Sequence, residues 1–280
     1  MEAPGAQGLR LTVAALPENL AVVRQALAGF AEAMGFDDDS IASLKTIVTE
    51  GCMNAIVHAY PEDESGPIEV VASPLDEGLE VVVRDQGEGF QPRPADPEDP
   101  SMRIGLPLIA ALSDGFEIRG GPGEGTELRM RLNFETSNGD RVEDPGNPPE
   151  TVGTLMTIAP GEYARPVLSR VIGALATRLD FSIDALSDTV LLGDAVVAHD
   201  VSDFLDRKVG IELVDGDGRL DFRIGPLVEG GSERILEGLE IPGVGSLRKL
   251  ASDIKVTRAS SGSSGREEAE YLLVVIDPGA

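Results

Sequence analysis

The sequence is short of cysteine, of positive charge and of long apolar segments, and each shortage excludes a class of protein. A single cysteine, Cys52, among 280 residues excludes an internal disulfide framework and fits a reducing compartment. Lys and Arg number 23 against 49 Asp and Glu, so direct binding to nucleic acid or to anionic membranes is disfavoured. No apolar run approaches the ~18–20 residues that span a bilayer, and residues 1–20 lack the pattern of a signal peptide. We therefore expect a cytoplasmic protein without nucleic-acid or membrane partners.

The remaining composition is that of an ordinary globular protein. Hydrophobic residues make up 41% and charged residues 26% of the chain, which is enough to build a sizeable core. A length of 280 residues suggests two domains or one large one. The net charge of −26 is spread over both halves and is compatible with a basic protein partner.

The same order of signals occurs twice, on either side of a segment rich in Pro, Gly, Asp and Glu at 135–152, which is typical of a linker. Each copy predicts a strand, two helices, a strand pair, a Gly-led helix and two final strands. In the first half these signals fall at 9–17, 20–34, 41–60, 68–73, 79–85 and 105–114, and in the second at 153–160, 167–179, 182–200, 211–225 and 245–253. Ser40 and Ser182 are the expected N-caps of the second helix in each copy. Internal duplication explains this repetition best.

The repeated unit predicts an α/β two-layer sandwich with one layer of helices over a sheet. The Asp-Gly turn in the segment LVDGDGRLDF favours a hairpin, so the mixed sheet is expected to be mostly antiparallel. The predicted domains are 8–134 and 153–278, joined by the linker.

Chemistry-bearing residues gather in the first half. Glu50, Asn54 and His58 are spaced by four and form one polar stripe on an otherwise apolar helix. By itself such a stripe is equally well explained as a solvated helix face.

Three glycine-containing motifs follow that stripe in order. They are D-x-G-x-G with Asp85, Gly87 and Gly89, then Gly105-Leu106 at the start of a helix, then Gly123, Gly125 and Thr126 before the last strand. Each motif is weak alone, because glycine-rich turns are usually only turns. The ordered set of four motifs is much more specific.

Residues 10–133 resemble the GHKL (Bergerat-fold) ATP-binding domains, and among them the anti-sigma-factor serine kinases of bacterial stress and sporulation switches. The segment EGCMNAIVHAY, from Glu50 to Tyr60, looks like the N box of that group. The resemblance implies a histidine-kinase-like ATPase fold and the cofactors ATP and Mg²⁺.

The resemblance also implies a role for each motif residue. Glu50 would orient and deprotonate the attacking hydroxyl, Asn54 would supply an oxygen to Mg²⁺, and Asp85 would accept from the adenine amino group. The remaining expected nucleotide contacts are Gly87, Gly89, Arg103, Gly105, Leu106, Gly123, Gly125 and Thr126. His58 is expected to be structural and Cys52 to pack in the core.

The activity that the resemblance implies is transfer of the ATP γ-phosphoryl group to a STAS-type anti-anti-sigma protein by a kinase that also holds a sigma factor inactive. Two alternatives stay open at this point. In the first alternative the chain is a non-catalytic regulatory protein in which ATP only organises a binding surface. In the second it is an ATP-binding partner of another signalling protein.

The second half lacks the groups that ATP needs. Alignment of the two copies puts Leu192 at the Glu50 position, Val196 at the Asn54 position and Pro226 at the Asp85 position. In the same alignment Gly245 matches Gly105, and Glu268 or Ala269 matches Thr126. Residues 153–278 are therefore predicted to be a degenerate copy, which would serve as a pseudo-dimer partner within one chain. Asp194 and His199 are interpreted as surface residues and not as metal ligands.

Overall fold

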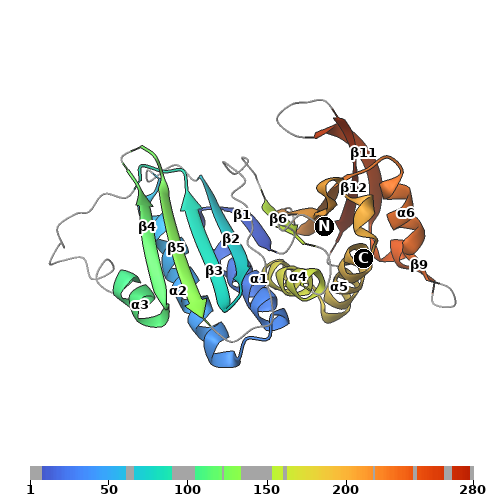
Figure 1. The fold of residues 1–280 in the computed structure, drawn as a ribbon. Coiled ribbons are helices and arrows are strands. Elements are labelled where there is room, and N and C mark those ends of the chain that lie inside the picture. Colours follow the sequence, from blue (N-terminus) through green and yellow to red (C-terminus); the bar gives the residue numbers. More distant parts are fainter. Residues whose placement is uncertain are drawn as a thin grey trace. The chain divides into compact units, whose positions relative to one another are not determined.

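The computed structural model describes residues 8–60, 66–89, 105–121, 123–133, 153–159, 163–216, 218–241, 245–261 and 267–277. The chain divides into two compact units, Met1–Val152 and Gly153–Ala280. Figure 1 shows that each unit combines a sheet with helices. None of the helices in these ranges is long and apolar enough to cross a membrane.

The first unit is a five-stranded antiparallel sheet with helices against it. Its strands follow the order β1-β2-β3-β5-β4. The elements are β1 (Leu9–Ala14), α1 (Asn19–Ala33), α2 (Asp38–His58), β2 (Pro67–Leu75), β3 (Gly78–Asp85), α3 (Gly105–Leu112), β4 (Gly115–Gly120) and β5 (Thr126–Asn133). The strands and helices predicted for this half are confirmed.

The two faces of this sheet differ in chemistry because successive strand residues point to opposite sides. One face is apolar and packs against α2, where a Cβ added to Gly51 would lie 3.0 Å from the Leu128 side chain and 3.5 Å from that of Val83. Cys52, on the same helix, is buried, and burial raises the pKa of its thiol to about 12. This confirms that Cys52 packs in the core.

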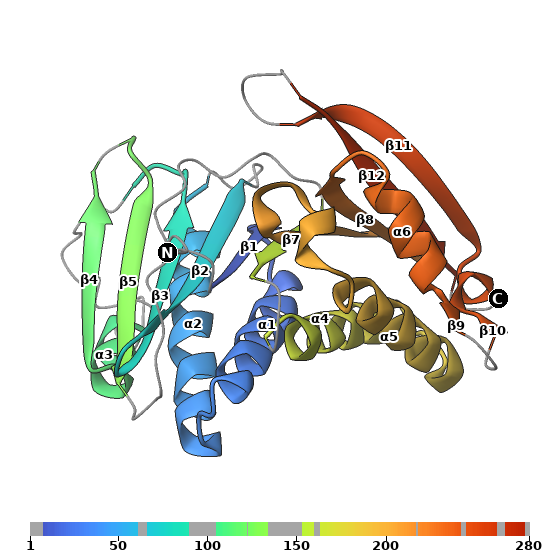
Figure 2. The ribbon, with the colours of Figure 1, turned by 45° about the vertical axis from the view of Figure 1, so that its right-hand side comes forward.

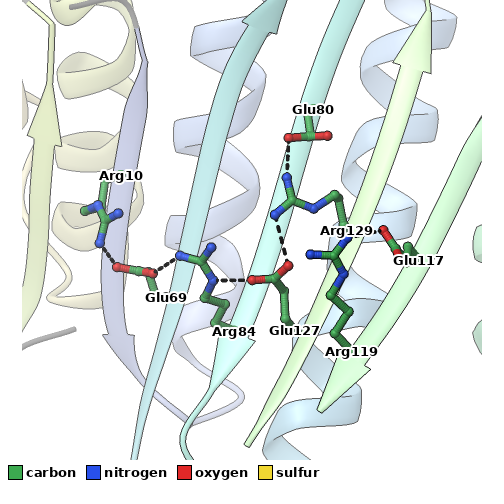
Figure 3. A network of polar contacts seen from close by, with 8 residues as sticks. All are labelled: Arg10, Glu69, Glu80, Arg84, Glu117, Arg119, Glu127 and Arg129. Atoms are coloured by element: carbon green, nitrogen blue, oxygen red, sulfur yellow. Dashed lines mark hydrogen bonds and ion pairs between the residues drawn. The ribbon is translucent and has the colours of Figure 1, made fainter. Parts of the chain in front are cut away.

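The opposite face carries a chain of ion pairs that crosses the strands (Figure 3). Glu69 is fully buried and pairs with both Arg10 and Arg84, and Glu80, which is 3% exposed, pairs with Arg129 and Arg131. Glu127 joins the two groups through Arg84 at 2.7 Å and Arg129 at 2.9 Å. Buried carboxylates are tolerated only when paired in this way. The helices lie behind the strands in this view, so the charged face is the one away from them.

The second unit repeats this architecture. Its main sheet follows the order β6-β7-β8-β12-β11, with antiparallel pairing between the strands of the unit. The elements are β6 (Thr154–Ile158), α4 (Ala164–Arg178), α5 (Ile183–Val197), the 3-10 turns η2 (Val201–Asp203) and η3 (Leu205–Arg207), β7 (Val209–Gly216), β8 (Arg219–Leu227), α6 (Gly231–Gly238), β9 (Glu240–Ile241), β10 (Gly245–Ser246), η4 (Leu247–Leu250), β11 (Asp253–Ser261) and β12 (Glu267–Ile276). Figure 2 shows α4 and α5 side by side.

The strand registers of the two units correspond along one row of residues, although β12 and β8 have a register shift between Glu270 and Leu272 that β5 and β3 lack. In each unit one row of facing residues runs across all five strands. The rows are Leu11, Val70, Val83, Leu128 and Ile118 in the first unit and Met156, Ile211, Ile224, Leu272 and Val256 in the second. All ten residues are apolar, so the two sheets agree in strand order, in register and in the chemistry of this row.

Two local predictions are wrong. The N-cap of α2 is Asp37, whose carboxylate accepts from the Ser40 N–H at 2.7 Å, whereas Ser182 does cap α5. The helix predicted at 245–253 is absent there: β10 pairs with β9 and a 3-10 turn follows. The helix between the third and fourth strands of the main sheet is α6, which begins at Gly231.

Candidate functional site

The long helix α2 carries the polar stripe. Because α2 runs without interruption from Asp38 to His58, its residues Glu50, Asn54 and His58 lie one above the other on one face. Glu50 and Asn54 are half-buried and His58 is exposed. The stripe is thus partly enclosed at its first two positions and open to solvent at its last.

The start of α3 lies directly over the first two positions. A Cβ added to Gly105 would lie 3.0 Å from Glu50 Oε2 and 3.7 Å from Asn54 Oδ1. The contact brings a carboxylate, an amide and a helix N-terminus to one place. Backbone N–H groups at a helix N-terminus attract anions, phosphate above all, and amide and carboxylate oxygens suit Mg²⁺. Leu106 follows as the second residue of α3.

Asp85 ends β3 and turns its carboxylate into the loop that follows. Its Oδ1 accepts from the Gly87 N–H at 3.0 Å and from the Thr126 N–H at 3.1 Å. Burial raises the pKa of Asp85, and the hydrogen bonds from Gly87 and Thr126 partly oppose that rise. A carboxylate accepts about four hydrogen bonds, so this group has capacity left for a ligand donor.

The glycines around Asp85 allow backbones to approach closely. A Cβ on Gly87 would lie 1.9 Å from the Ala59 carbonyl oxygen, and one on Gly125 would lie 2.3 Å from that of Asp85. Gly89 and Gly125 also have positive φ angles of 83° and 72°, which favour glycine. Gly123 has a positive φ as well and donates its N–H to the Glu88 carbonyl at 2.8 Å. The loops that contain Gly87, Gly89 and Gly125 are therefore locked together.

The structure joins the motifs in two groups. Glu50, Asn54 and Gly105 meet in the C-terminal half of α2, whereas Asp85, Gly87, Gly125 and Thr126 meet just beyond its C-terminal end, beside Ala59. Arg103, with the rest of 90–104, lies outside the described residues. Its predicted role stays a prediction.

Tyr60, for which the sequence predicted no role, lies at the second group, beside Gln86. The Tyr60 hydroxyl accepts from the Gln86 N–H at 3.0 Å and donates to the Pro67 carbonyl at 2.7 Å. The sequence feature that could have indicated this role is the position of Tyr60 at the end of the segment Glu50–Tyr60, whose other polar residues are candidates for the site.

The corresponding place in the second unit is built differently. The register rows put Pro226 two residues after Ile224, as Asp85 stands two residues after Val83, so the alignment of Pro226 with Asp85 agrees with the register. When the two helices are aligned at their N-caps, Glu50, which lies 13 positions after Asp37, matches Ala195, which lies 13 positions after Ser182. Asn54 then matches His199, beyond the end of α5, and the alignments with Leu192 and Val196 are three residues off. Neither alignment restores a carboxylate at the Glu50 position or an amide at the Asn54 position.

In the second unit the N-terminus of α6 is occupied by a carboxylate of the same chain, that of Glu270. Glu270 accepts from the Ser232 hydroxyl at 2.5 Å and from Arg258 at 3.1 Å, at the start of α6. The hydrogen bond from the Ser232 hydroxyl, with those from the α6 backbone and Arg258, lowers the pKa of Glu270 to about 2. Glu270 stands two residues before Leu272 as Thr126 stands before Leu128, but a register shift between Glu270 and Leu272 pairs Glu270 with Leu227, so the expected match of Thr126 with Glu268 or Ala269 stays a prediction. By place in the fold the counterpart of Gly105 is Gly231, not Gly245.

Asp194 and His199 do not share a site. Asp194 bonds Arg165 at 2.8 Å and Ser169 at 3.0 Å, while the His199 ring faces Asp203 at 3.9 Å. Within the described ranges no group of three or more His, Cys, Asp or Glu side chains is arranged to hold a metal ion.

The fold of the first unit is that of the histidine kinase-like ATPase class, and the family model of the histidine kinase-like ATPase domain matches residues 13–132. The serine-protein kinase RsbW of Bacillus subtilis (strain 168) is 31% identical over 147 residues, which cover 48% of this chain and 89% of that protein. The serine-protein kinase RsbW of Oceanobacillus iheyensis is 36% identical over 122 residues, 39% of this chain and 77% of that protein. A crystal structure of the RsbU and RsbW domains of Rv1364c from Mycobacterium tuberculosis matches 49% of this chain and 34% of that chain, at 25% identity and a TM-score of 0.37.

The chain belongs to the RsbW family of serine-protein kinases. Its enzyme class is that of an ATP-dependent serine-protein kinase.

Proposed function

We propose that residues 8–134 form the catalytic domain, which binds ATP with Mg²⁺ and transfers the γ-phosphoryl group to a serine or threonine of a small partner protein. The observation that carries this proposal is the meeting of Glu50, Asn54 and the α3 N-terminus, with distances of 3.0 and 3.7 Å from the Gly105 Cβ position. A base, a metal ligand and a phosphate-binding backbone at one point are the parts that phosphoryl transfer needs.

Each residue has a chemical task in this proposal. Mg²⁺-ATP supplies the phosphoryl group and the cation that offsets its charge. The Asn54 amide oxygen would hold the metal, and the backbone N–H groups of Gly105 and Leu106 would bind phosphate oxygens. The half-buried Glu50 carboxylate orients the substrate hydroxyl and takes its proton. The family resemblance adds Arg103, which lies outside the described residues, as a further phosphate contact.

The base of the nucleotide binds at the other group of residues. The half-buried Asp85 carboxylate, held by two backbone N–H groups, would accept from the adenine amino group. The family resemblance assigns Gly87, Gly89, Gly123, Gly125 and Thr126 to the binding site of the base. A Cβ at Gly87 or Gly125 would meet the protein's own backbone at 1.9 or 2.3 Å, so the packing of these loops around Asp85 requires glycine at both positions.

The partners we propose are those that the family resemblance implies. The phosphorylated partner is a STAS-type anti-anti-sigma protein, and the kinase sequesters a sigma factor in the cytoplasm. The net charge of −26 supports a basic partner surface.

We propose further that residues 153–278 are a degenerate copy of the kinase domain, attached through the linker 135–152. The shared strand order and register support the duplication, and Pro226 and Glu270 support the loss of nucleotide binding. This copy takes the place of a dimer partner within one chain. Sedimentation of the full chain tests that role: we expect a monomer, and an obligate homodimer formed through the first unit contradicts it.

Substitution of Glu50 tests the catalytic proposal. For Glu50→Gln we expect Mg²⁺-ATP affinity within about twofold of wild type and phosphoryl transfer to a STAS-type protein of the same organism reduced about 10²–10⁴-fold. Glu77→Gln, an exposed change in the β2–β3 turn, is the matched control and leaves both unchanged. If Glu50→Gln retains full transfer, Glu50 is not the base. If the wild-type protein binds Mg²⁺-ATP yet phosphorylates no candidate, a non-catalytic regulatory role replaces the kinase.

A further inference from the structure

We propose that Tyr60 is a positioning residue for adenine recognition: its hydroxyl group holds the backbone next to Asp85 and so fixes the direction of the Asp85 carboxylate. The inference rests on the proposed role of Asp85 as the adenine acceptor. It assigns a role in nucleotide specificity to a residue that does not itself touch the reacting phosphate.

The hydroxyl bridges two strands where their pairing ends. Strands β2 and β3 pair as far as Ile68 and Asp85, so the next facing residues are Pro67 and Gln86. Tyr60 Oη accepts from the Gln86 N–H at 3.0 Å and donates to the Pro67 carbonyl at 2.7 Å. The hydroxyl thus takes the place of a direct strand-to-strand hydrogen bond and sets the separation of the two backbones at this point.

The end of α2 is fastened to the same loop at a neighbouring residue. The Ala59 carbonyl accepts from the Glu88 N–H at 2.8 Å, and Gly87 approaches Ala59 so closely that a Cβ would lie 1.9 Å from its oxygen. Residues 59 and 60 therefore hold the loop on both sides of Gly87.

Gly87 is the link between this anchor and the carboxylate. Its N–H donates to Asp85 Oδ1 at 3.0 Å, and the second donor, the Thr126 N–H, comes from another strand at 3.1 Å. If the anchor at Gln86 is released, Gly87 moves and Asp85 keeps one of its two orienting bonds. The carboxylate then turns away from the direction in which adenine presents its amino group.

The tyrosine is built into its place. Its ring lies against Gly66, where a Cβ would fall 2.1 Å from Tyr60 Cε1. Burial raises the pKa of Tyr60, and the nearby Asp85 charge acts in the same direction. The hydroxyl therefore keeps its proton, and its ability to donate to Pro67, throughout the neutral range.

The test compares two nucleotides on the full chain. Mg²⁺ complexes of ATP and of purine riboside 5′-triphosphate, which lacks the amino group, are titrated against wild type and Tyr60→Phe. We expect Tyr60→Phe to weaken ATP binding about tenfold, the effect of roughly one hydrogen bond, and to change the analogue's affinity less than about twofold. The ratio of the two affinities falls, and the phosphoryl-transfer rate at saturating ATP stays at the wild-type value while KM for ATP rises.

Controls separate this role from a general loss of structure. Tyr271→Phe removes a tyrosine hydroxyl from the second unit and leaves all nucleotide affinities unchanged. An equal loss for both nucleotides, a fall in the saturated rate, or no change in Tyr60→Phe overturns the positioning role while the proposed kinase function stands. If wild-type protein binds the two nucleotides equally, the assignment of Asp85 to adenine fails and the inference with it.

Discussion

A single methyl group added at Gly105 is expected to lower the rate of phosphoryl transfer without lowering the free energy of unfolding. In Gly105→Ala the new Cβ lies 3.0 Å from Glu50 Oε2 and 3.7 Å from Asn54 Oδ1, and a carbon–oxygen contact at 3.0 Å is tighter than side chains ordinarily adopt. The Glu50 side chain is the movable partner, so its carboxylate is displaced by a few tenths of an ångström or more. Misplacement of a catalytic group by ~1 Å costs about 10²-fold in rate, and we expect a loss of 10–10²-fold.

The same substitution does not weaken the helix. Gly105 is the first residue of α3, and alanine favours helix over glycine by about 0.5–1 kcal/mol. We therefore expect urea unfolding to show unchanged or slightly increased stability while phosphoryl transfer falls. Gly173→Ala in α4, where an added Cβ meets nothing within 4 Å, is the matched control and is expected to stabilise without affecting transfer. Full activity in Gly105→Ala would refute the claim that α3 begins over the catalytic pair.

Two further predictions concern charged groups. Glu69→Ala leaves the Arg10 and Arg84 guanidinium groups without their shared buried carboxylate, so urea titration should show that the free energy of unfolding falls by about 3–5 kcal/mol. In the matched control Glu117→Ala, which removes an exposed pair with Arg119, it should fall by less than about 1 kcal/mol. Equal losses in the two variants would contradict the buried network. Because the pKa of Glu270 is lowered from 4.5 to about 2, its contribution to stability is present above pH 4.5 and lost as the pH falls toward 2. Unfolding of wild type and Glu270→Gln at several pH values should show a difference that shrinks over this window, and a constant difference would argue against the carboxylate at α6.

The polar stripe and the sheet were predictable because they depend on local periodicity. Glu50 and Asn54 lie four residues apart on a helix with an apolar opposite face, and this spacing alone places them together. The same reasoning located β2, β3 and the hairpin of the second unit.

The local sequence pattern could not distinguish between two neighbouring N-cap residues, or between a helix and a short strand followed by a turn. Asp37 and Ser40 are both good capping residues, and the structure uses Asp37 because its carboxylate reaches the Ser40 N–H. The segment from Gly245 contains helix-forming residues, yet its first two residues pair with β9 and only a 3-10 turn follows.

The anchor at Tyr60 required tertiary information. Its partner Gln86 is 26 residues away in the sequence, and only the packing of α2 on the folded sheet brings the end of α2 beside the end of β3. The ion pairs on the charged face arise in the same way, since Glu80 and Arg129 are 49 residues apart.

The most direct test of the account is the number of nucleotides that one chain binds. Calorimetric titration with Mg²⁺-ATP is expected to give one nucleotide per wild-type chain. In Asp85→Asn the amide can still accept the Gly87 and Thr126 N–H groups, but its NH₂ then faces the adenine amino group donor to donor, so this binding should be lost. Two nucleotides per chain, or one that persists in Asp85→Asn, would contradict the claim that only the first unit has kept a nucleotide site.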